Sequence, residues 1–295
     1  MDKITTHLWF DKEAVEAAKL YTSVFKDSKT TNTTTIHDTP SGDCDIVSFT
    51  LAGQPFMAIS AGPIFKFNPS ISFHVACKTK DEVDELWKKL SQGGTILMEL
   101  GEYPFSEKYD WLQDKFGLSW QIIYLGDKTP KQKITPVMMF VGNVCGKAEE
   151  AIKFYSTVFH NSKIYNILRY GKGEAPDKEG TVKYASFAIE GKEFGAMDSS
   201  HEHKFAFNEA ISFIVHCDTQ KEIDYYWGKL SAVPESEQCG WLKDKYGVSW
   251  QIVPTAMDEM MKSKDEKKMA RVTEAFLKMK KFDIETLKRA YEGKK

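Results

Sequence analysis

The sequence has few cysteines, no excess of charge of one sign and no long apolar run, and each lack excludes a class of protein. Its five cysteines are odd in number and scattered over 295 residues, unlike the paired pattern of a disulfide-stapled secreted domain. A net charge of −2, from 40 basic and 42 acidic residues, gives no basic surface for nucleic acid or an anionic membrane. No apolar segment approaches the ~20 residues of a membrane span. The opening residues, MDKITTHLWF, lack a signal-peptide pattern, so we expect a cytoplasmic protein without a nucleic-acid or membrane partner.

What the sequence does contain is an internal repeat. Residues 67–91 recur at 207–231 with 14 of 25 positions identical, and residues 111–123 recur at 241–253 with 9 of 13 identical. A chain of this length has room for two ordinary domains, each with its own core. We therefore predict two copies of one domain, at 1–126 and 134–254, joined by the polar segment 126–133 and followed by a tail, 255–295, that repeats nothing.

Each copy reads as a β-α-β-β-β pattern written twice. In the first copy Asp11 is expected to cap a helix over 12–25, and Ala52-Gly53-Gln54 to turn a hairpin. Thr79 and Glu82 form a capping-box signal before a second helix. The remaining apolar stretches predict strands, at 4–10, 45–51, 55–60 and 71–77, with three more between 93 and 124.

The second copy and the tail depart from this pattern. The second copy is ten residues shorter before Trp241, which predicts the loss of a strand or hairpin there. In the tail, apolar residues recur at helical spacing around Phe276 and again after Asp283. We expect two helices there, packed on the body or on a partner chain.

A set of motifs shared by both copies resembles one family. The motifs are a helix ending in Tyr-x-x-Val-Phe, an Ile-Ser-Phe strand and the run Asp-Lys-x-Gly-x-Ser-Trp-Gln-Ile. Together, over residues 3–254, they resemble the PhnB-like branch of the vicinal-oxygen-chelate superfamily, which includes glyoxalases, bleomycin-resistance proteins and dioxygenases. The resemblance implies an α+β fold of two tandem domains, each of two paired β-α-β-β-β modules forming a curved sheet around a cleft, plus C-terminal helices.

The resemblance also bears on assembly and on one activity label. Single-domain relatives commonly pair as dimers, so the fused chain is expected to be a pseudo-dimer; further homodimerisation stays open. Some relatives carry a demethylubiquinone methyltransferase label. A glycine-rich turn opening a helix would support that reading, but the nearest candidate, residues 171–173, lies in a polar loop.

Superfamily enzymes hold a divalent metal at three strand positions, and this chain lacks charged ligands at all of them. Counting from the helices and turns assigns those positions to neutral residues in both copies: Thr6, Ser72 and Gln121, then Pro136, Ser212 and Gln251. Divalent ions are usually held by imidazole or carboxylate groups. We therefore predict no metal and no other cofactor.

One alternative keeps a metal site open in the first copy. A register slip would bring together His7, His74 and Gln121, a set of two imidazoles and one amide. The second copy has Val137 and Ile214 at the histidine positions. This alternative predicts a metal-dependent lyase, isomerase or oxygenase.

The favoured function is binding of a small apolar or aromatic metabolite in a cleft. Aromatic walls with a few polar groups suit such ligands, although tryptophans at these positions also serve as core. No catalytic residue can be assigned. The candidate pocket residues include five of the neutral strand positions, namely Thr6, Ser72, Gln121, Ser212 and Gln251. The others are His74, Trp111, Ser119, His216, Trp241 and Ser249.

Overall fold

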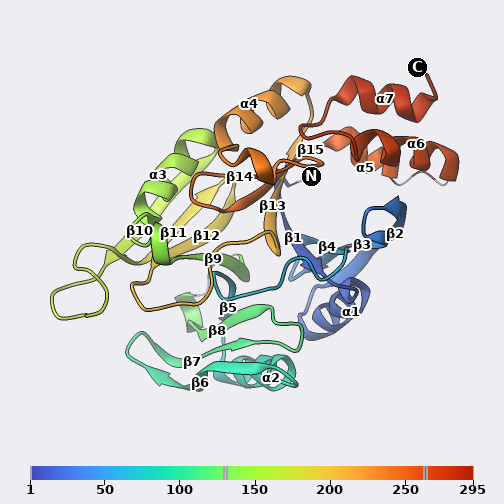
Figure 1. Ribbon diagram of the computed structural model, residues 1–295. Coiled ribbons are helices and arrows are strands. Elements are labelled where there is room, and N and C mark those ends of the chain that lie inside the picture. Colours follow the sequence, from blue (N-terminus) through green and yellow to red (C-terminus); the bar gives the residue numbers. More distant parts are fainter. Residues whose placement is uncertain (1, 129, 131, 262, 264, 295) are drawn as a thin grey trace.

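The protein is an α+β molecule built on two large mixed sheets. Its computed structural model describes residues 2–128, 130, 132–261, 263 and 265–294 (Figure 1). One sheet has seven strands, in the order β14 (Trp241–Lys243), β15 (Ser249–Pro254), β13 (Ile211–Cys217), β1 (Ile4–Phe10), β4 (Gln54–Ser60), β3 (Gly42–Leu51) and β2 (Lys29–Thr39). The other has eight strands, in the order β10 (Ser162–Arg169), β11 (Val182–Ile189), β12 (Lys192–Asp198), β9 (Ile134–Phe140), β5 (Ile71–Cys77), β8 (Ser119–Tyr124), β7 (Ser106–Gln113) and β6 (Thr95–Tyr103).

Helices follow the strands in the predicted places. The four helices of the repeats are α1 (Ala14–Val24), α2 (Lys80–Leu90), α3 (Ala148–Val158) and α4 (Gln220–Leu230). Figure 1 shows α3 and α4 at the upper left and α2 below, on the outer side of the sheets. The predicted fold class of tandem β-α-β-β-β modules is confirmed.

The structure adds which modules share a sheet, and the pairing runs between the repeats. In the seven-stranded sheet β1 of the first repeat pairs with β13 of the second, Thr6 opposite Phe213. In the eight-stranded sheet β5 of the first repeat pairs with β9 of the second, Phe73 opposite Pro136. Each sheet is thus assembled from both repeats, which is the pseudo-dimer that the fusion predicted.

Within one repeat the two modules are joined by their helix-side core. Asp114, in the turn before β8, accepts hydrogen bonds from the Tyr21 hydroxyl of α1 at 2.7 Å and from Trp120 Nε1 at 2.9 Å. Its other oxygen accepts the backbone N–H groups of Phe116 and Leu118, so the carboxyl is fully bonded although buried. This network explains why the Asp-Lys-x-Gly run occurs in both copies.

Asp244 makes the matching network in the second repeat. It accepts from the Tyr155 hydroxyl at 2.7 Å and from Trp250 Nε1 at 2.9 Å. The equivalent aspartates Asp114 and Asp244 therefore hold together the turn, the last strand and the first helix of their repeats.

Local signals fixed most turns and caps. Ala52 and Gly53 have φ of 48° and 75°, the left-handed pair that a two-residue hairpin needs. Thr79 caps α2 by accepting the Glu82 N–H, as predicted. The prediction that Asp11 caps α1 is wrong: the helix begins at Ala14, and its N–H donates to Ser60 at the end of β4.

In its described part the tail forms three helices rather than two: α5 (Thr255–Met261), α6 (Glu266–Phe276) and α7 (Ile284–Glu292). They pack on the body beside β15, at the upper right of Figure 1. In the shortened second copy a single strand of three residues, β14, precedes β15, where the first copy has β6 and β7, which confirms the predicted loss of a strand or hairpin. The segment between α6 and α7 takes its place, since the carbonyls of Met279 and Lys280 accept the N–H groups of Cys239 and Gly240.

Among the residues that the structure describes, no helix has both the length and the apolar character to cross a membrane.

Candidate functional site

Five of the candidate side chains share one surface of the seven-stranded sheet. His7 on β1 lies directly opposite Ser212 on β13, and Ser212 lies in register with Ser249 on β15. Trp241 on β14 lies opposite Gln251 on β15. Directly paired residues point to the same side of a sheet, and so do residues two apart on one strand. We call this surface face A, defined by His7, Ser212, Trp241, Ser249 and Gln251.

Ring contacts show that face A is concave. Strands β14 and β1 are three places apart in the sheet, which in a flat sheet is about 14 Å. The rings of Trp241 and His7 nevertheless lie 5.2 Å apart, edge to face, and Trp241 also lies 5.9 Å from the ring of Trp9. The sheet must therefore curl so that these side chains converge over the two serines.

The repeat places a matching surface on the eight-stranded sheet. Gln121 on β8 lies opposite Trp111 on β7 and in register with His74 on β5, and Ser72 lies in register with Ser119. We call this surface face B, defined by Ser72, His74, Trp111, Ser119 and Gln121. It curls as well, because the hydroxyl of Tyr184 on β11 reaches His74 Nδ1 at 3.4 Å from three strands away.

On face B the polar side chains are bonded to one another. Trp111 Nε1 donates to Ser119 Oγ at 2.8 Å. The Tyr109 hydroxyl donates to Gln121 Oε1 at 2.7 Å, while Gln121 Nε2 donates to Ser72 Oγ at 2.6 Å. Each of the two serines and the amide therefore has at least one hydrogen-bond partner.

On face A the same positions are left partly unbonded. Gln251 Nε2 donates to Ser212 Oγ at 2.9 Å, as in the other sheet. Trp241, however, turns its ring to His7, and Ser249 Oγ is buried with no hydrogen-bond partner in the part of the chain that the structure describes. His7 Nδ1 is likewise buried and unpartnered. Cys239 stands at the position of Tyr109, so no phenol reaches Gln251 Oε1. Buried polar atoms without partners are costly and mark positions where a further group can bond.

Burial keeps the histidines of both faces neutral. Loss of solvent lowers the pKa of His7 to about 3 and that of His74 to about 4. Each therefore presents one donor and one acceptor nitrogen at neutral pH. Neither face has an unpaired charge at these positions.

The structure corrects the predicted position on the first strand. Thr6 is buried on the opposite side of β1, where its Oγ1 accepts a hydrogen bond from Lys192 at 2.8 Å. His7 occupies the position on face A instead. Counting residues along a strand gave the wrong side because one position changes the face.

The alternative metal set is also not brought together on one sheet. His7 belongs to the seven-stranded sheet, whereas His74 and Gln121 belong to the eight-stranded sheet. Pairing between the repeats separates residues that lie in the same copy of the sequence.

His216 lies at one end of face A, near the tail. Its Nε2 is 3.0 Å from the Thr5 hydroxyl, and its Nδ1 is 3.6 Å from a carboxylate oxygen of Asp258 in α5. Burial, the larger effect, lowers the pKa of His216, whereas Asp258 raises it. The sequence did not reveal Thr5, Trp9 or Asp258 as neighbours of the site. Thr5 and Trp9 could have been found by the period of two around His7.

The residues present do not fit a divalent metal. The strand positions of face A offer one neutral imidazole, a hydroxyl and an amide whose nitrogen is already committed to Ser212. Across the described part of the chain, no three or more histidine, cysteine, aspartate or glutamate residues are grouped to hold a metal ion. Without a carboxylate, little offsets the dehydration of the ion.

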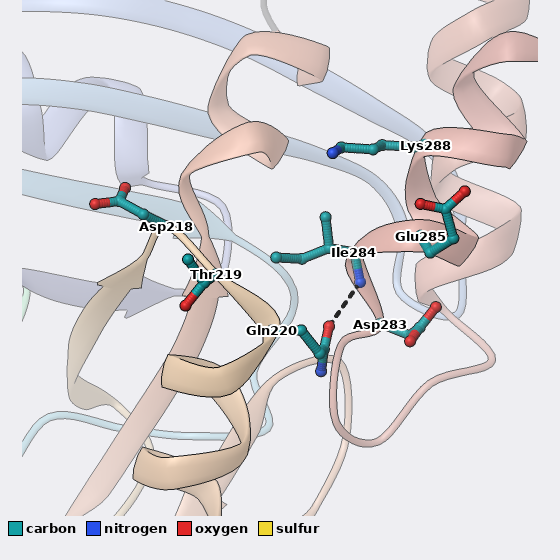
Figure 2. A pocket seen from close by; sticks show the side chains of 7 residues that line it. All are labelled: Asp218, Thr219, Gln220, Asp283, Ile284, Glu285 and Lys288. Carbon is teal, nitrogen blue, oxygen red and sulfur yellow. Dashed lines mark hydrogen bonds between the residues drawn. The ribbon is translucent and has the colours of Figure 1, made fainter.

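Two surface hollows lie away from both faces. One, of about 260 Å³, separates the start of α4 from α7. Figure 2 shows Gln220 there, accepting the Ile284 N–H at 2.9 Å, with Lys288 across the gap. The other, of about 290 Å³, lies between the loop after β9 and Tyr246. Neither hollow is lined by a predicted pocket residue. The first lies where the tail helix α7 packs near the start of α4.

Comparison with known proteins places the same two segments in one family. Residues 2–123 and 132–253 each match the family model described as 3-demethylubiquinone-9 3-methyltransferase. A solved structure described as a putative 3-demethylubiquinone-9 3-methyltransferase, PhnB protein, from Bacillus cereus is 41% identical, with a TM-score of 0.40; the match covers 42% of this chain and 99% of that one. Glyoxalase I from Zea mays is 15% identical, with a TM-score of 0.51, over 88% of this chain and 96% of that one, and shares the fold. No curated protein matches the chain.

Proposed function

Because the chain belongs to the 3-demethylubiquinone-9 3-methyltransferase family, as two tandem PhnB-like copies, we propose that it binds a small apolar or aromatic metabolite on a concave sheet face without a metal. The glyoxalase fold hosts many activities, so the proposal rests on the side chains of the faces rather than on the fold.

The observation that carries the proposal is the chemistry of those faces. Neutral hydrogen-bonding groups occupy the strand positions, and tryptophan rings stand over them. On face A, Ser249 Oγ and His7 Nδ1 are buried without hydrogen-bond partners among the described residues, and the His7 ring lies against Trp241. Such a surface suits an apolar ligand that carries a small polar group.

The family description names a methyltransferase, and the chain does not favour that activity. Residues 171–173 lie between the antiparallel strands β10 and β11, and no helix follows them. A typical S-adenosylmethionine site needs the glycine turn to open a helix against the cofactor. We therefore assign no methyl transfer to this chain.

Elemental analysis of the purified full chain, together with mass spectrometry of a solvent extract, tests the proposal. We expect an organic compound in the extract and Zn, Mn, Fe and Ni each far below one per chain. A stoichiometric metal that disappears in His74→Ala would overturn the metal-free proposal and favour the rival function, a metal-dependent enzyme. An extract with no organic compound, from protein that also fails to bind any small ring compound, would contradict ligand binding altogether.

A further inference from the structure

We propose that face A alone is the ligand site, that Trp241 is its gate, and that its ligand is an uncharged ring compound carrying a hydroxyl group. This inference rests on the proposed function and adds to it the face, the moving part and the chemical class.

The first step is the difference between the two faces. On face B the serines and the amide are bonded by Trp111, Tyr109 and Gln121, and among the described residues none of the side-chain polar atoms of face B is buried without a hydrogen-bond partner. Face A leaves His7 Nδ1 and Ser249 Oγ without a hydrogen-bond partner among the described residues, although both residues are at least 97% buried. A fold tolerates such orphans where something else bonds them. The copies have therefore diverged, and the vacancy is on face A.

The second step is that the molecule contains both positions of the gate. Trp111 shows one position, with its ring nitrogen donating to Ser119 Oγ. Trp241 shows the other, with its ring edge to face against His7 and Ser249 left unbonded. If Trp241 turned as Trp111 does, its Nε1–H would bond Ser249 and its ring would leave His7. This rotation of the Trp241 side chain gives Ser249 a hydrogen-bond partner and opens the space beside the His7 imidazole.

The third step is the chemistry of the space that the turn opens. Trp9 and Phe65, whose rings are 5.1 Å apart, form an aromatic wall beside Trp241. His7 is neutral, so its Nδ1 is either a donor or an acceptor, according to the tautomer. A hydroxyl group can donate or accept and so matches both forms. An aromatic wall with one such polar point selects a ring compound with a hydroxyl.

The fourth step is the absence of a counter-charge for an ionic ligand. Lys243, two residues beyond Trp241, is paired with Glu209 at 2.8 Å. At the other end of face A, His216 lies against Asp258. Lys243 is already ion-paired, and burial lowers the pKa of His216, so neither group is free to balance the charge of an ionic ligand, and burying an unpaired ligand charge is costly. The ligand is therefore uncharged.

Binding of three naphthalene probes to the full chain tests this inference. Equilibrium dialysis would compare 1-naphthol, naphthalene and 1-naphthoate, which differ in the hydroxyl and in charge. We expect one 1-naphthol per chain, bound at least tenfold more tightly than either of the others. Equal affinity for all three, tighter binding of 1-naphthoate, or no binding of any probe would overturn the inference.

Matched variants of the two faces identify the site. We expect His7→Phe and Ser249→Ala to weaken 1-naphthol binding at least tenfold, because they remove the hydroxyl partner and the open position of the gate. Their face B counterparts, His74→Phe and Ser119→Ala, should change it less than threefold. The reverse pattern, or no difference between the pairs, would overturn the assignment to face A.

A readout without ligand keeps the test independent of probe choice. Ser119→Ala removes the bond to Trp111 and should lower the thermal midpoint, whereas Ser249→Ala removes an unbonded hydroxyl and should leave it unchanged or higher. Equal losses would show that Ser249 is bonded in solution and would overturn the inference. If a metabolite co-purifies while the variants show no effect, the inference fails and the proposed function stands.

Discussion

At the scale of single residues, the junction between the repeats contains a buried lysine. Lys192 opens β12, and its Nζ donates to Thr6 Oγ1 and lies 5.8 Å from the centre of the Phe56 ring. Burial lowers its pKa to about 7. The equivalent residue of the first repeat is Gln54, whose amide bonds both backbone groups of Ile134 at 2.8 Å. At this position the first repeat therefore bonds its partner across the junction through the neutral amide of Gln54, and the second repeat does so through the amine of Lys192.

Replacing this lysine should stabilise the protein at neutral pH. Because the pKa falls from 10.5 to about 7 and each unit corresponds to about 1.4 kcal/mol, we expect Lys192→Met to raise the free energy of unfolding by on the order of 4 kcal/mol at pH 7, where the folded amine is half protonated. Urea unfolding of both proteins measures the difference. Gln54→Met is the matched control and should destabilise, because it breaks two bonds to Ile134.

The same substitution should change how stability depends on pH. Between pH 7 and about 10 the unfolded chain holds a proton on Lys192 that the folded chain has released. The wild type therefore gains up to about 1.4 kcal/mol per pH unit over that window, relative to Lys192→Met. Below pH 7 the difference between the proteins should be constant. If the free energies of unfolding of the two proteins instead differed by the same amount at every pH from 7 to 10, Lys192 would have its ordinary pKa in the folded state.

The buried aspartates provide a second prediction at this scale. Tyr155→Phe removes one of the four hydrogen bonds to Asp244, and Tyr21→Phe does the same for Asp114. A bond to a charged group contributes about 1.5–3 kcal/mol, and we expect each variant to lose that much stability. Denaturant unfolding measures both losses. A loss under 0.5 kcal/mol in both variants would contradict the role given to this network.

The sequence predicted which residues lie at the site where a local pattern marks the position. It did not do so where the answer depends on which side of a strand a residue faces. Gln121, Gln251, Ser72 and Ser212 lie on the concave faces as the family resemblance implied. Thr6 does not, because a shift of one position along β1 reverses the side. The sequence of the first strand alone does not show which of its residues face the concave side, because that depends on the strands it pairs with.

At the scale of elements, the tail compensates for the hairpin that the second copy lacks. In the first copy β6 pairs with β7 over Met98–Trp111 and Gly101–Tyr109. In the second copy the tail carbonyls bond the chain at Cys239 and Gly240. Phe282 lies directly on Gly240, where a side chain like that of Asp110 has no room.

Removing the tail contact should therefore cost stability. Phe282 is 2% exposed, and Phe282→Ala is expected to lose about 3–5 kcal/mol by leaving a cavity over Gly240. The exposed hairpin residue Phe105 is the control, and Phe105→Ala should change stability by less than about 0.5 kcal/mol. Equal effects of the two substitutions, measured by urea unfolding, would show that the tail is not part of the fold.

The sequence predicted elements best where a pattern had clear ends. The strand Ile71–Cys77 matches its prediction residue for residue, because its apolar run ends at a capping box. The tail was predicted with one helix too few, since α5 begins directly where β15 ends and has no cap signal of its own. The start of α1 was misplaced because its first N–H is bonded by Ser60, far along the chain.

At the scale of the whole molecule, the fused copies are joined through their sheets rather than only by the linker. β1 pairs with β13, and β5 with β9, so each sheet crosses the junction. Gln54 and Lys192 add side-chain bonds across it. The sequence could not show which modules pair, because the same alternation of residues serves a partner in either copy.

This arrangement predicts that the two halves remain together when the linker is cut. A protease site inserted after Lys128, cleaved in the folded protein, should give two fragments that co-elute as a 1:1 complex and separate only in denaturant. The uncleaved variant is the control for elution position. Fragments that separate under native conditions while keeping their fold would contradict the pairing between repeats.

The central claim is that this family member binds an uncharged organic ligand and no metal, and native mass spectrometry of the freshly purified full chain tests it most directly. The account predicts a mass above that of the denatured chain by one organic compound, which is lost in Ser249→Ala and kept in Ser119→Ala. A mass increase equal to one divalent metal ion, carried by both variants, would contradict it.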